Sequence, residues 1–297
     1  MVAAADIIHD VLIDLPSRAR VMCHVAGNGP PVVLLHGWGA SWYLWKDTML
    51  ALAGAGFSAY APDHIGCGHS DKPRLCYTPH DYAVYLEGLL AALRLDNINL
   101  VGHSLGGHIA LSYALQHPDR VSRLVLVGPA YSPLRQAVRT RAQMMLAVAG
   151  LPLLGELALR LMPAGVMRRL MNQPWGGFHR PDRLPADFLD RMVADYLQNA
   201  SPLVCNTIRY LVIFSLPGLS RFRGDADLLP YLGKLNVPTL VIWGQRDALL
   251  NPSSYPLLAA RIPGAMAHPI ADAGHTPPME APLEFQRTLL DFLMKRP

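Results

Sequence analysis

Ser104 stands in a pattern that can turn a serine hydroxyl into a nucleophile. An apolar run over 97–101 predicts a buried strand, and the pattern over 107–115 predicts a helix. Between them, Gly102 and Gly106 flank Ser104 in the G-x-S-x-G spacing of a nucleophile elbow. Side chains at the two glycine positions would push strand and helix apart, so glycine permits a turn sharp enough to expose the hydroxyl. An ordinary glycine-rich turn is the alternative interpretation of this motif alone.

His275 and Asp247 are the residues that could activate this serine. A serine hydroxyl needs a base to take its proton, and the base needs a group that orients it. Among the twelve histidines, His275 follows the last expected strand, from which a loop can reach back over the sheet edge. Asp247 follows the strand before that one, whereas 128–130 offers no acid after the preceding strand. We therefore expect a catalytic triad of Ser104, Asp247 and His275.

Acyl transfer also requires two N–H groups that hold the oxyanion. The backbone N–H of Leu105, directly after the serine, is expected to supply one of them. Trp38, in the loop 36–39, is expected to supply the other, because the glycines of this loop let its backbone turn toward the site. The Trp38 side chain could also form one wall of the substrate pocket.

Strands and helices alternate through most of the chain, which predicts an α/β fold with a mostly parallel, doubly wound sheet. The first two strands are expected to be antiparallel because only a short turn at 16–17 joins them. The expected strands cover 6–15, 18–26, 31–35, 57–63, 97–101, 121–128, 238–244 and 265–270. The expected helices cover 45–53, 80–94, 107–115, 253–261 and 280–295.

The alternation breaks between residues 131 and 230. This stretch is rich in Leu, Met and Arg and has no clear buried strand, so we expect an inserted helical cap or lid. The two parts of the core would then be 1–130 and 231–297. The cap should roof the active site, since it leaves the core just after one strand of the sheet and returns just before the next.

An apolar stretch of the expected cap offers residues for a hydrophobic pocket. Met144, Met145 and Leu146 are expected to line it together with Trp38. For each of the cap residues, packing between cap helices is the alternative. The arginines of the same region could contact acidic lipid headgroups at a membrane surface, although a solvated basic face explains them more simply.

Taken together, these motifs resemble the α/β-hydrolase superfamily, in the serine hydrolase branch with a helical cap between the sixth and seventh strands. The resemblance covers nearly the whole chain. It implies hydrolysis through an acyl-enzyme without a cofactor, but it leaves the substrate open. The motifs that carry it are His36-Gly37-Trp38-Gly39, Asp63-His64-Ile65-Gly66-Cys67-Gly68-His69-Ser70, Gly102-His103-Ser104-Leu105-Gly106-Gly107, Gly244-Gln245-Arg246-Asp247 and Gly274-His275.

The expected function is hydrolysis of carboxylic esters, esterase-like or lipase-like, with a hydrophobic acyl or aromatic substrate. The same branch also holds thioesterases, C–C bond hydrolases and cofactor-free haloperoxidases. A C–C hydrolase of meta-cleavage products would need a cation for the substrate carboxylate, for which Arg191 or Arg209 could serve. A ligand receptor on the same fold is the alternative outside enzymes. Epoxide hydrolases and haloalkane dehalogenases are disfavoured because their elbow carries Asp.

Several polar residues near the motifs have simpler explanations than catalysis. Asp63 is expected to bond its own loop, His36 to stabilise its loop, and His103 to pack away from the serine hydroxyl. No metal is expected, because the nearest candidates do not have the spacing of a usual zinc site. Those candidates are His64, Cys67, His69 and Cys76.

The composition fits a globular protein and gives no sign of nucleic-acid binding. Of 297 residues, 51% are hydrophobic and 16% charged, and the net charge of +4 forms no stripe suited to nucleic acid. Residues 1–14 do not read as a signal peptide, and the four cysteines show no pairing pattern, so we expect a cytoplasmic protein. A monomer or homodimer is expected.

Overall fold

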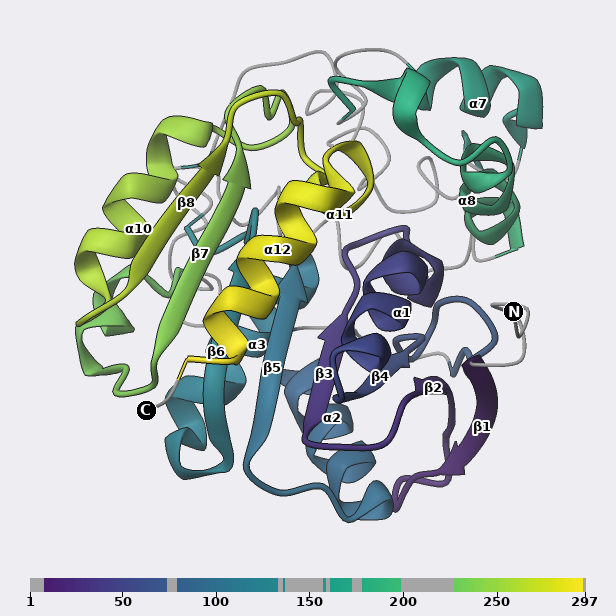
Figure 1. Ribbon diagram of the computed structural model, residues 1–297. Helices are drawn as coiled ribbons and strands as arrows, with labels where there is room; N and C mark the ends of the chain where they lie inside the picture. Colours follow the sequence, from purple (N-terminus) through teal and green to yellow (C-terminus); the bar gives the residue numbers. More distant parts are fainter. Residues whose placement is uncertain are drawn as a thin grey trace, which may run out of the picture.

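A mixed sheet of eight strands forms the centre of the described chain (Figure 1). The computed structural model describes residues 8–73, 79–132, 136, 157–158, 161–172, 178–198 and 227–295. The strands are β1 (Ile8–Asp14), β2 (Arg20–Ala26), β3 (Pro31–Leu35), β4 (Ser58–Pro62), β5 (Ile98–His103), β6 (Val121–Val127), β7 (Thr239–Gly244) and β8 (Met266–Ile270).

The strand order confirms the predicted doubly wound sheet. It runs β1-β2-β4-β3-β5-β6-β7-β8, with β1–β2 and β2–β4 antiparallel and every later pair parallel. β5 and β7 are buried along their whole length, as expected for parallel strands with helices on both faces. β1, at one edge, is mostly exposed or partly buried instead, and only Ile13 of this strand is buried.

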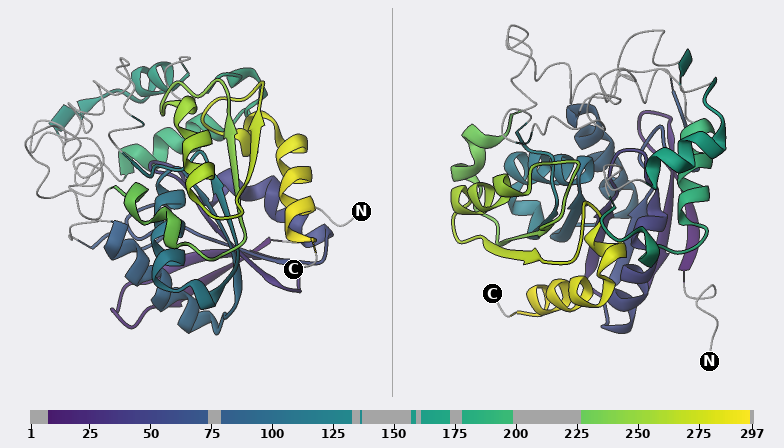
Figure 2. Two further views of the ribbon diagram at one scale, coloured as in Figure 1. Left: turned by 90° about the vertical axis from the view of Figure 1, so that its left-hand side faces the viewer. Right: turned by 90° about the horizontal axis from the view of Figure 1, so that it is seen from above.

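Helices cover both faces of the sheet. α1 and α12 pack on one face and α2, α3 and α10 on the other (Figures 1 and 2). Trp45, Met49 and Phe285 are fully buried on the first face, and Leu90 and Tyr113 on the second. The helices of the core are α1 (Lys46–Gly54), α2 (Pro79–Leu93), α3 (Leu105–Gln116), α10 (Tyr255–Arg261), α11 (Pro277–Glu280) and α12 (Pro282–Leu293).

The chain order reverses at β3, which places two loops next to each other. β3 lies between β4 and β5, and Leu35 is in register with Gly102. The loops that leave β3 and β5 therefore start side by side at the carboxyl ends of the strands. In open α/β sheets such a reversal creates a crevice in which ligands bind.

The described residues between β6 and β7 form helices and no strand. They include α7 (Ala164–Met171) and α8 (Phe188–Gln198), which lie near α1 in Figure 1. The Tyr43 hydroxyl donates to the Asp187 carboxylate at 2.9 Å, just before α8. The division into 1–130, 131–230 and 231–297 stays a prediction. Met144, Met145 and Leu146 lie outside the described residues.

No helix in the described ranges combines the length and the apolar character needed to cross a membrane.

Candidate active site

The turn between β5 and α3 holds Ser104 in an unusual backbone conformation. Its φ is 52° and its ψ is −112°, a region that costs a non-glycine residue about 1–3 kcal/mol. A Cβ on Gly102 would lie 2.2 Å from the carbonyl oxygen of Gly106, and one on Gly106 would lie 2.3 Å from that of Leu35. Glycine is therefore required at both positions because backbone atoms fill the space that a side chain would need.

Asp247 and His275 form a buried hydrogen-bonded pair. His275 Nδ1 lies 2.7 Å from Asp247 Oδ2, and the two side chains are 6% and 1% exposed. The other carboxylate oxygen of Asp247 accepts the backbone N–H groups of Leu249 and Leu250 at 2.8 and 2.9 Å. These bonds hold the carboxylate toward the ring, so Nδ1 carries the proton and Nε2 keeps its lone pair.

Ser104 and His275 both contact the end of β6. The Ser104 N–H donates to the carbonyl of Val127, and a Cβ on Gly128 would lie 3.7 Å from His275 Nδ1. His275 Nε2 is buried and makes no hydrogen bond to the described residues, including Ser104. Hydrogen bonds between a nucleophile and its base are often loose without substrate. The triad itself stays a prediction that this arrangement supports.

The two expected oxyanion donors lie on either side of the serine. Leu105 is the first residue of α3, where backbone N–H groups have no partner within the helix. Trp38 follows Gly37, on which a Cβ would lie 3.1 Å from Ser104 Cβ. The Trp38 side chain is half-buried and packs against both hydrophobic clusters of the core. The loop after β3 thus runs directly past the nucleophile.

His103 bonds the backbone of the expected catalytic histidine. Its Nε2–H donates to the carbonyl of His275 at 2.8 Å, and the two ring centroids are 4.9 Å apart. Burial, with the neighbouring His275, lowers the pKa of His103 to about 3. His103 therefore stays neutral and supports the loop of His275. From the sequence we expected His103 only to pack away from the serine hydroxyl, and we did not predict this hydrogen bond.

Asp63 and His36 have the structural roles expected of them. Asp63 accepts the backbone N–H groups of Trp42 and His69, each at 2.9 Å. Burial would raise its pKa, but the His24 ring, His36 and these N–H groups lower it to about 2. His36 Nε2 accepts the N–H of His64, whose ring donates to the His36 carbonyl at 2.8 Å.

Glu280 is a fully buried carboxylate beside the expected active site that was not predicted from the sequence. Its Oε2 accepts the N–H groups of Gly274, His179 and Arg180 at 3.0, 2.7 and 2.8 Å, and its Oε1 accepts that of Thr276 at 3.1 Å. Glu280 thus joins both neighbours of His275 to the chain segment before α8. The only available signal was its position five residues after His275, which does not reveal burial.

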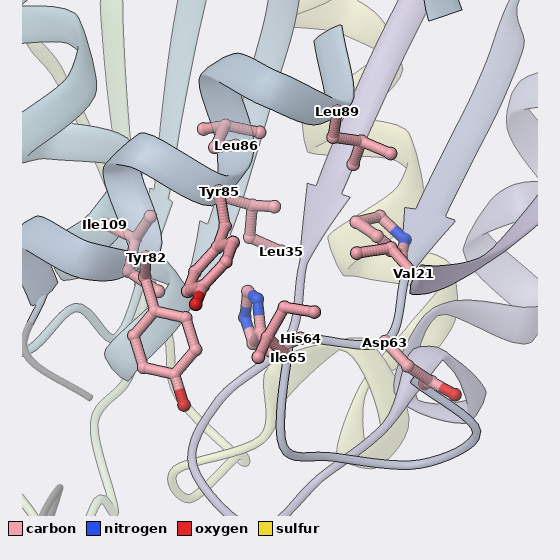
Figure 3. Close-up of a pocket in the computed structure, with 11 residues that line it drawn as sticks. Val21, Leu35, Asp63, His64, Ile65, Tyr82, Tyr85, Leu86, Leu89 and Ile109 are labelled. Atoms are coloured by element: carbon pink, nitrogen blue, oxygen red, sulfur yellow. The ribbon is translucent and has the colours of Figure 1, made fainter. Parts of the chain in front are cut away.

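A small cavity lies between α2 and the loop after β4, and it is too small to be the substrate pocket. Its volume of about 20 Å³ accommodates a single water molecule. Figure 3 shows Tyr82 and Tyr85 of α2 on one side of it and His64 directed toward them. The Asp63 carboxylate extends away from these rings in the same view. The cavity therefore separates α2 from the loop after β4.

Two of the candidates that were set aside as metal ligands have other roles. The ring of His64 is bonded to the His36 backbone. Burial, with nearby Asp63, raises the pKa of the Cys67 thiol to about 12, so a thiolate is disfavoured. Cys76 lies outside the described residues, and His69 contacts Asp63.

The family follows from a match that spans most of the chain. A model of the alpha/beta hydrolase fold matches residues 30–282. The chain belongs to the α/β hydrolase family. The resemblance stated from the motifs is thereby confirmed at the level of the family, whereas the reaction differs among α/β hydrolases and needs separate evidence.

Curated relatives and solved structures extend this likeness. A hydrolase of 2-hydroxy-6-oxononadienedioate and 2-hydroxy-6-oxononatrienedioate from Paraburkholderia xenovorans is 31% identical over 278 residues, covering 90% of this chain and 88% of that protein. A cis-3-alkyl-4-alkyloxetan-2-one decarboxylase from Shewanella oneidensis is 31% identical over 264 residues, covering 84% and 77%. The structure of a haloalkane dehalogenase from Agrobacterium tumefaciens matches with a TM-score of 0.81 at 23% identity, covering 99% and 98%. The last likeness concerns the fold alone.

Proposed function

We propose that this α/β hydrolase is a serine enzyme that cleaves carboxylic esters through an acyl-enzyme. The observation that carries the proposal is the buried Asp247–His275 pair beside the strained turn of Ser104. A carboxylate that orients an imidazole next to a serine on a sharp turn is the arrangement for nucleophilic acyl transfer. No cofactor takes part in the proposed reaction.

In the proposed mechanism, His275 Nε2 takes the proton of Ser104 while Oγ attacks the ester carbonyl carbon. The N–H groups of Trp38 and Leu105 stabilise the resulting oxyanion, and Asp247 stabilises the imidazolium. The proton then passes from Nε2 to the departing alcohol as the acyl–oxygen bond breaks. Water, deprotonated by the same nitrogen, attacks the acyl-enzyme and releases the acid and the serine.

We further propose that the substrate is a small molecule with a hydrophobic acyl or aromatic group. Trp38 supports this because it is half-buried and directly follows Gly37, which lies against Ser104. Met144, Met145 and Leu146 stay predicted pocket residues. A cytoplasmic location and a monomer or homodimer also stay predictions.

The test measures turnover of p-nitrophenyl esters with short and long acyl chains. Ser104→Ala should lower kcat by a factor on the order of 10⁵, as removal of a serine nucleophile does elsewhere. Ser17→Ala, at an exposed position in the β1–β2 turn, is the matched control and should leave kcat unchanged. Equal turnover by the two variants would refute the triad, and strict preference for acetate would refute the hydrophobic pocket.

Cleavage of C–C bonds in meta-cleavage products is a second candidate, favoured by the likeness to the P. xenovorans hydrolase. Of the cations considered for a substrate carboxylate, Arg191 is bonded to Asp187 at 2.7 Å and lies over the Tyr43 ring. Arg209 lies outside the described residues. Loss of the absorbance of a 2-hydroxy-6-oxo-dienoate, compared with ester turnover by the same preparation, decides between the two reactions.

A ligand receptor on the hydrolase fold, the candidate outside enzymes, predicts binding without turnover of any ester, thioester, lactone or dienone. A fluorophosphonate that labels wild-type protein but not Ser104→Ala would demonstrate an activated serine. Epoxide hydrolysis and dehalogenation remain disfavoured because Ser104, not Asp, occupies the elbow.

A further inference from the structure

Three possible metal ligands meet around the Asp63 carboxylate. They are His24 of β2, Asp63 after β4, and His69 six residues further along the same loop. One ligand atom of each lies within 4.8 Å of the other two. His24 and Asp63 are buried and His69 is exposed, so the cluster is closed toward the core and open toward solvent.

His24 is oriented as a metal-binding imidazole is. Its Nδ1–H donates to Asp10 Oδ1 at 2.6 Å, and the indole of Trp42 stacks on the ring at a centroid distance of 4.0 Å. In the neutral ring, this bond leaves the lone pair on Nε2. A histidine that binds a metal through one ring nitrogen usually donates the N–H of the other, often to a carboxylate. This hydrogen bond sets the tautomer and the orientation of the ring.

The Nε2 atom of His24 points to a carboxylate without bonding to it. It is buried, and none of the described residues forms a hydrogen bond with it. Asp63 Oδ2 is 3.9 Å away, which exceeds the length of an N–H···O hydrogen bond. A lone pair that faces a carboxylate in a buried place is unfavourable unless a positive charge lies between the two atoms.

Asp63, whose side chain is fully buried, and His69 are the other two candidate ligands. His69 Nδ1 lies 3.7 Å from the same oxygen, Oδ2, and the His69 side chain is 75% exposed. The exposed ring can rotate toward the carboxylate and provides a route for an ion from solvent.

We propose that His24, Asp63 and His69 bind a divalent transition-metal ion of the zinc class. Bonds of about 2.0–2.2 Å from a tetrahedral ion place its nitrogen and oxygen ligands about 3.4 Å apart. The two separations to Asp63, 3.9 and 3.7 Å, need to shorten by only a few tenths of an ångström. The third, between the His24 and His69 rings, is within 4.8 Å, and rotation of the exposed His69 ring can shorten it. Two imidazoles and one carboxylate suit Zn²⁺ and its first-row neighbours and leave a fourth position for water.

The surrounding charges also favour a cation here. Asp195 of α8 lies close enough to Asp63 for the two negative charges to repel each other. The nearby Lys72 ammonium donates to the carbonyls of Gly68 and Ser70 at 2.7 and 3.1 Å, so it bonds the loop backbone. A bound ion would relieve the repulsion between the carboxylates of Asp63 and Asp195, and would thereby join the core to α8.

The competing explanation is that His24 is an imidazolium between the Asp10 and Asp63 carboxylates and that no metal binds. The two explanations differ in what occupies Nε2, a proton or a metal ion. They also differ in the role of His69. A three-ligand metal site requires the His69 ring, whereas an imidazolium at His24 does not. Neither depends on the proposed esterase activity.

The decisive experiment is calorimetric titration of Zn²⁺ into the chelator-treated full chain at pH 7. We expect one ion per chain, with Asp10→Asn weakening binding about 10–100-fold and His69→Ala at least as strongly. Both altered side chains are mostly exposed, so the fold should persist. His9→Ala, at an exposed histidine of β1, is the matched control and should bind as the wild type does.

A spectroscopic measurement adds a second readout. Co²⁺ should give the visible absorption of a tetrahedral or five-coordinate ion in wild-type protein and lose it in His69→Ala. Nuclear magnetic resonance of ring nitrogens should show Zn²⁺ shifting Nε2 of His24. The proposal is overturned if no stoichiometric binding occurs, if His69→Ala binds as tightly as His9→Ala, or if both ring nitrogens of His24 stay protonated at saturating Zn²⁺.

Discussion

The Glu280 carboxylate accepts the backbone N–H of Gly274 at 3.0 Å, one residue before His275. The same side chain accepts the N–H of Thr276, one residue after it. A buried charge therefore holds the loop on both sides of the proposed catalytic base. Since the carboxylate also accepts the N–H groups of His179 and Arg180, movement of the segment before α8 would be transmitted to this loop.

Charged side chains reinforce the same contact at the surface. Arg183 Nη2 and Arg180 Nη1 lie 2.5 and 3.0 Å from Asp272 Oδ2, and Arg183 also donates to the Glu280 carbonyl at 3.0 Å. These exposed pairs contribute less to stability than the buried carboxylate does, because solvent screens them. Glu280 is thus the main connection between the two segments.

Glu280→Gln should destabilise the protein and slow catalysis. The amide turns one oxygen acceptor into a donor that faces backbone N–H groups, at a cost of about 3 kcal/mol in the free energy of unfolding. Displacement of His275 should lower kcat about 10–100-fold with little change in KM. Urea denaturation and ester kinetics measure the two effects. Glu284→Gln, at the exposed partner of His268, is the control; equal stability of the two variants would contradict the prediction.

Asp247→Asn should lower kcat by a factor on the order of 10⁴ while the fold persists. The amide oxygen can still accept the N–H groups of Leu249 and Leu250, but the amide nitrogen then faces His275 Nδ1. This interaction puts the ring proton on Nε2, where it blocks uptake of the serine proton. Asp272→Asn removes a carboxylate that is 52% exposed and serves as the control. If the two variants hydrolyse esters equally fast, Asp247 is not the triad acid.

The buried neutral His103 should make the protein sensitive to acid. Its pKa falls from 6.5 in the unfolded chain to about 3 in the folded one, mainly because burial disfavours the charged ring. The unfolded chain therefore binds more protons below pH 6.5, and stability falls as the pH drops from there toward 3. One such group contributes about 1.4 kcal/mol per pH unit.

His103→Gln should remove this contribution. Urea denaturation between pH 6 and 4 should give a slope smaller by about 1.4 kcal/mol per pH unit than in the wild type. His9→Gln, at an exposed position, is the control and should keep the wild-type slope. An unchanged slope in His103→Gln would mean that His103 is already charged in the folded protein.

Local patterns were sufficient for the fold and for the glycines of the turn that holds Ser104. The turn at Ser104 can be predicted from the sequence because a sharp strand-to-helix turn requires glycine at 102 and 106. A Cβ at either position would clash with backbone atoms, which agrees with this requirement. The alternating apolar runs were sufficient for the strands, since each buried strand needs its own apolar residues. The interpretation of Asp63 as a residue that bonds its own loop also held, because its partner His69 belongs to that loop, although Asp63 also bonds Trp42 after β3.

The sequence by itself determined the elements, their order and the family, because strand patterns, helix patterns and turn glycines are local properties of the chain. Only the tertiary structure decided that Glu280 bonds Gly274 and that His103 bonds His275 across 172 positions. It also brought His24 to Asp63. Such contacts depend on which loops the strand order makes neighbours and on which polar atoms then lose water. The spacing of residues along the chain predicts neither which loops become neighbours nor which polar atoms become buried.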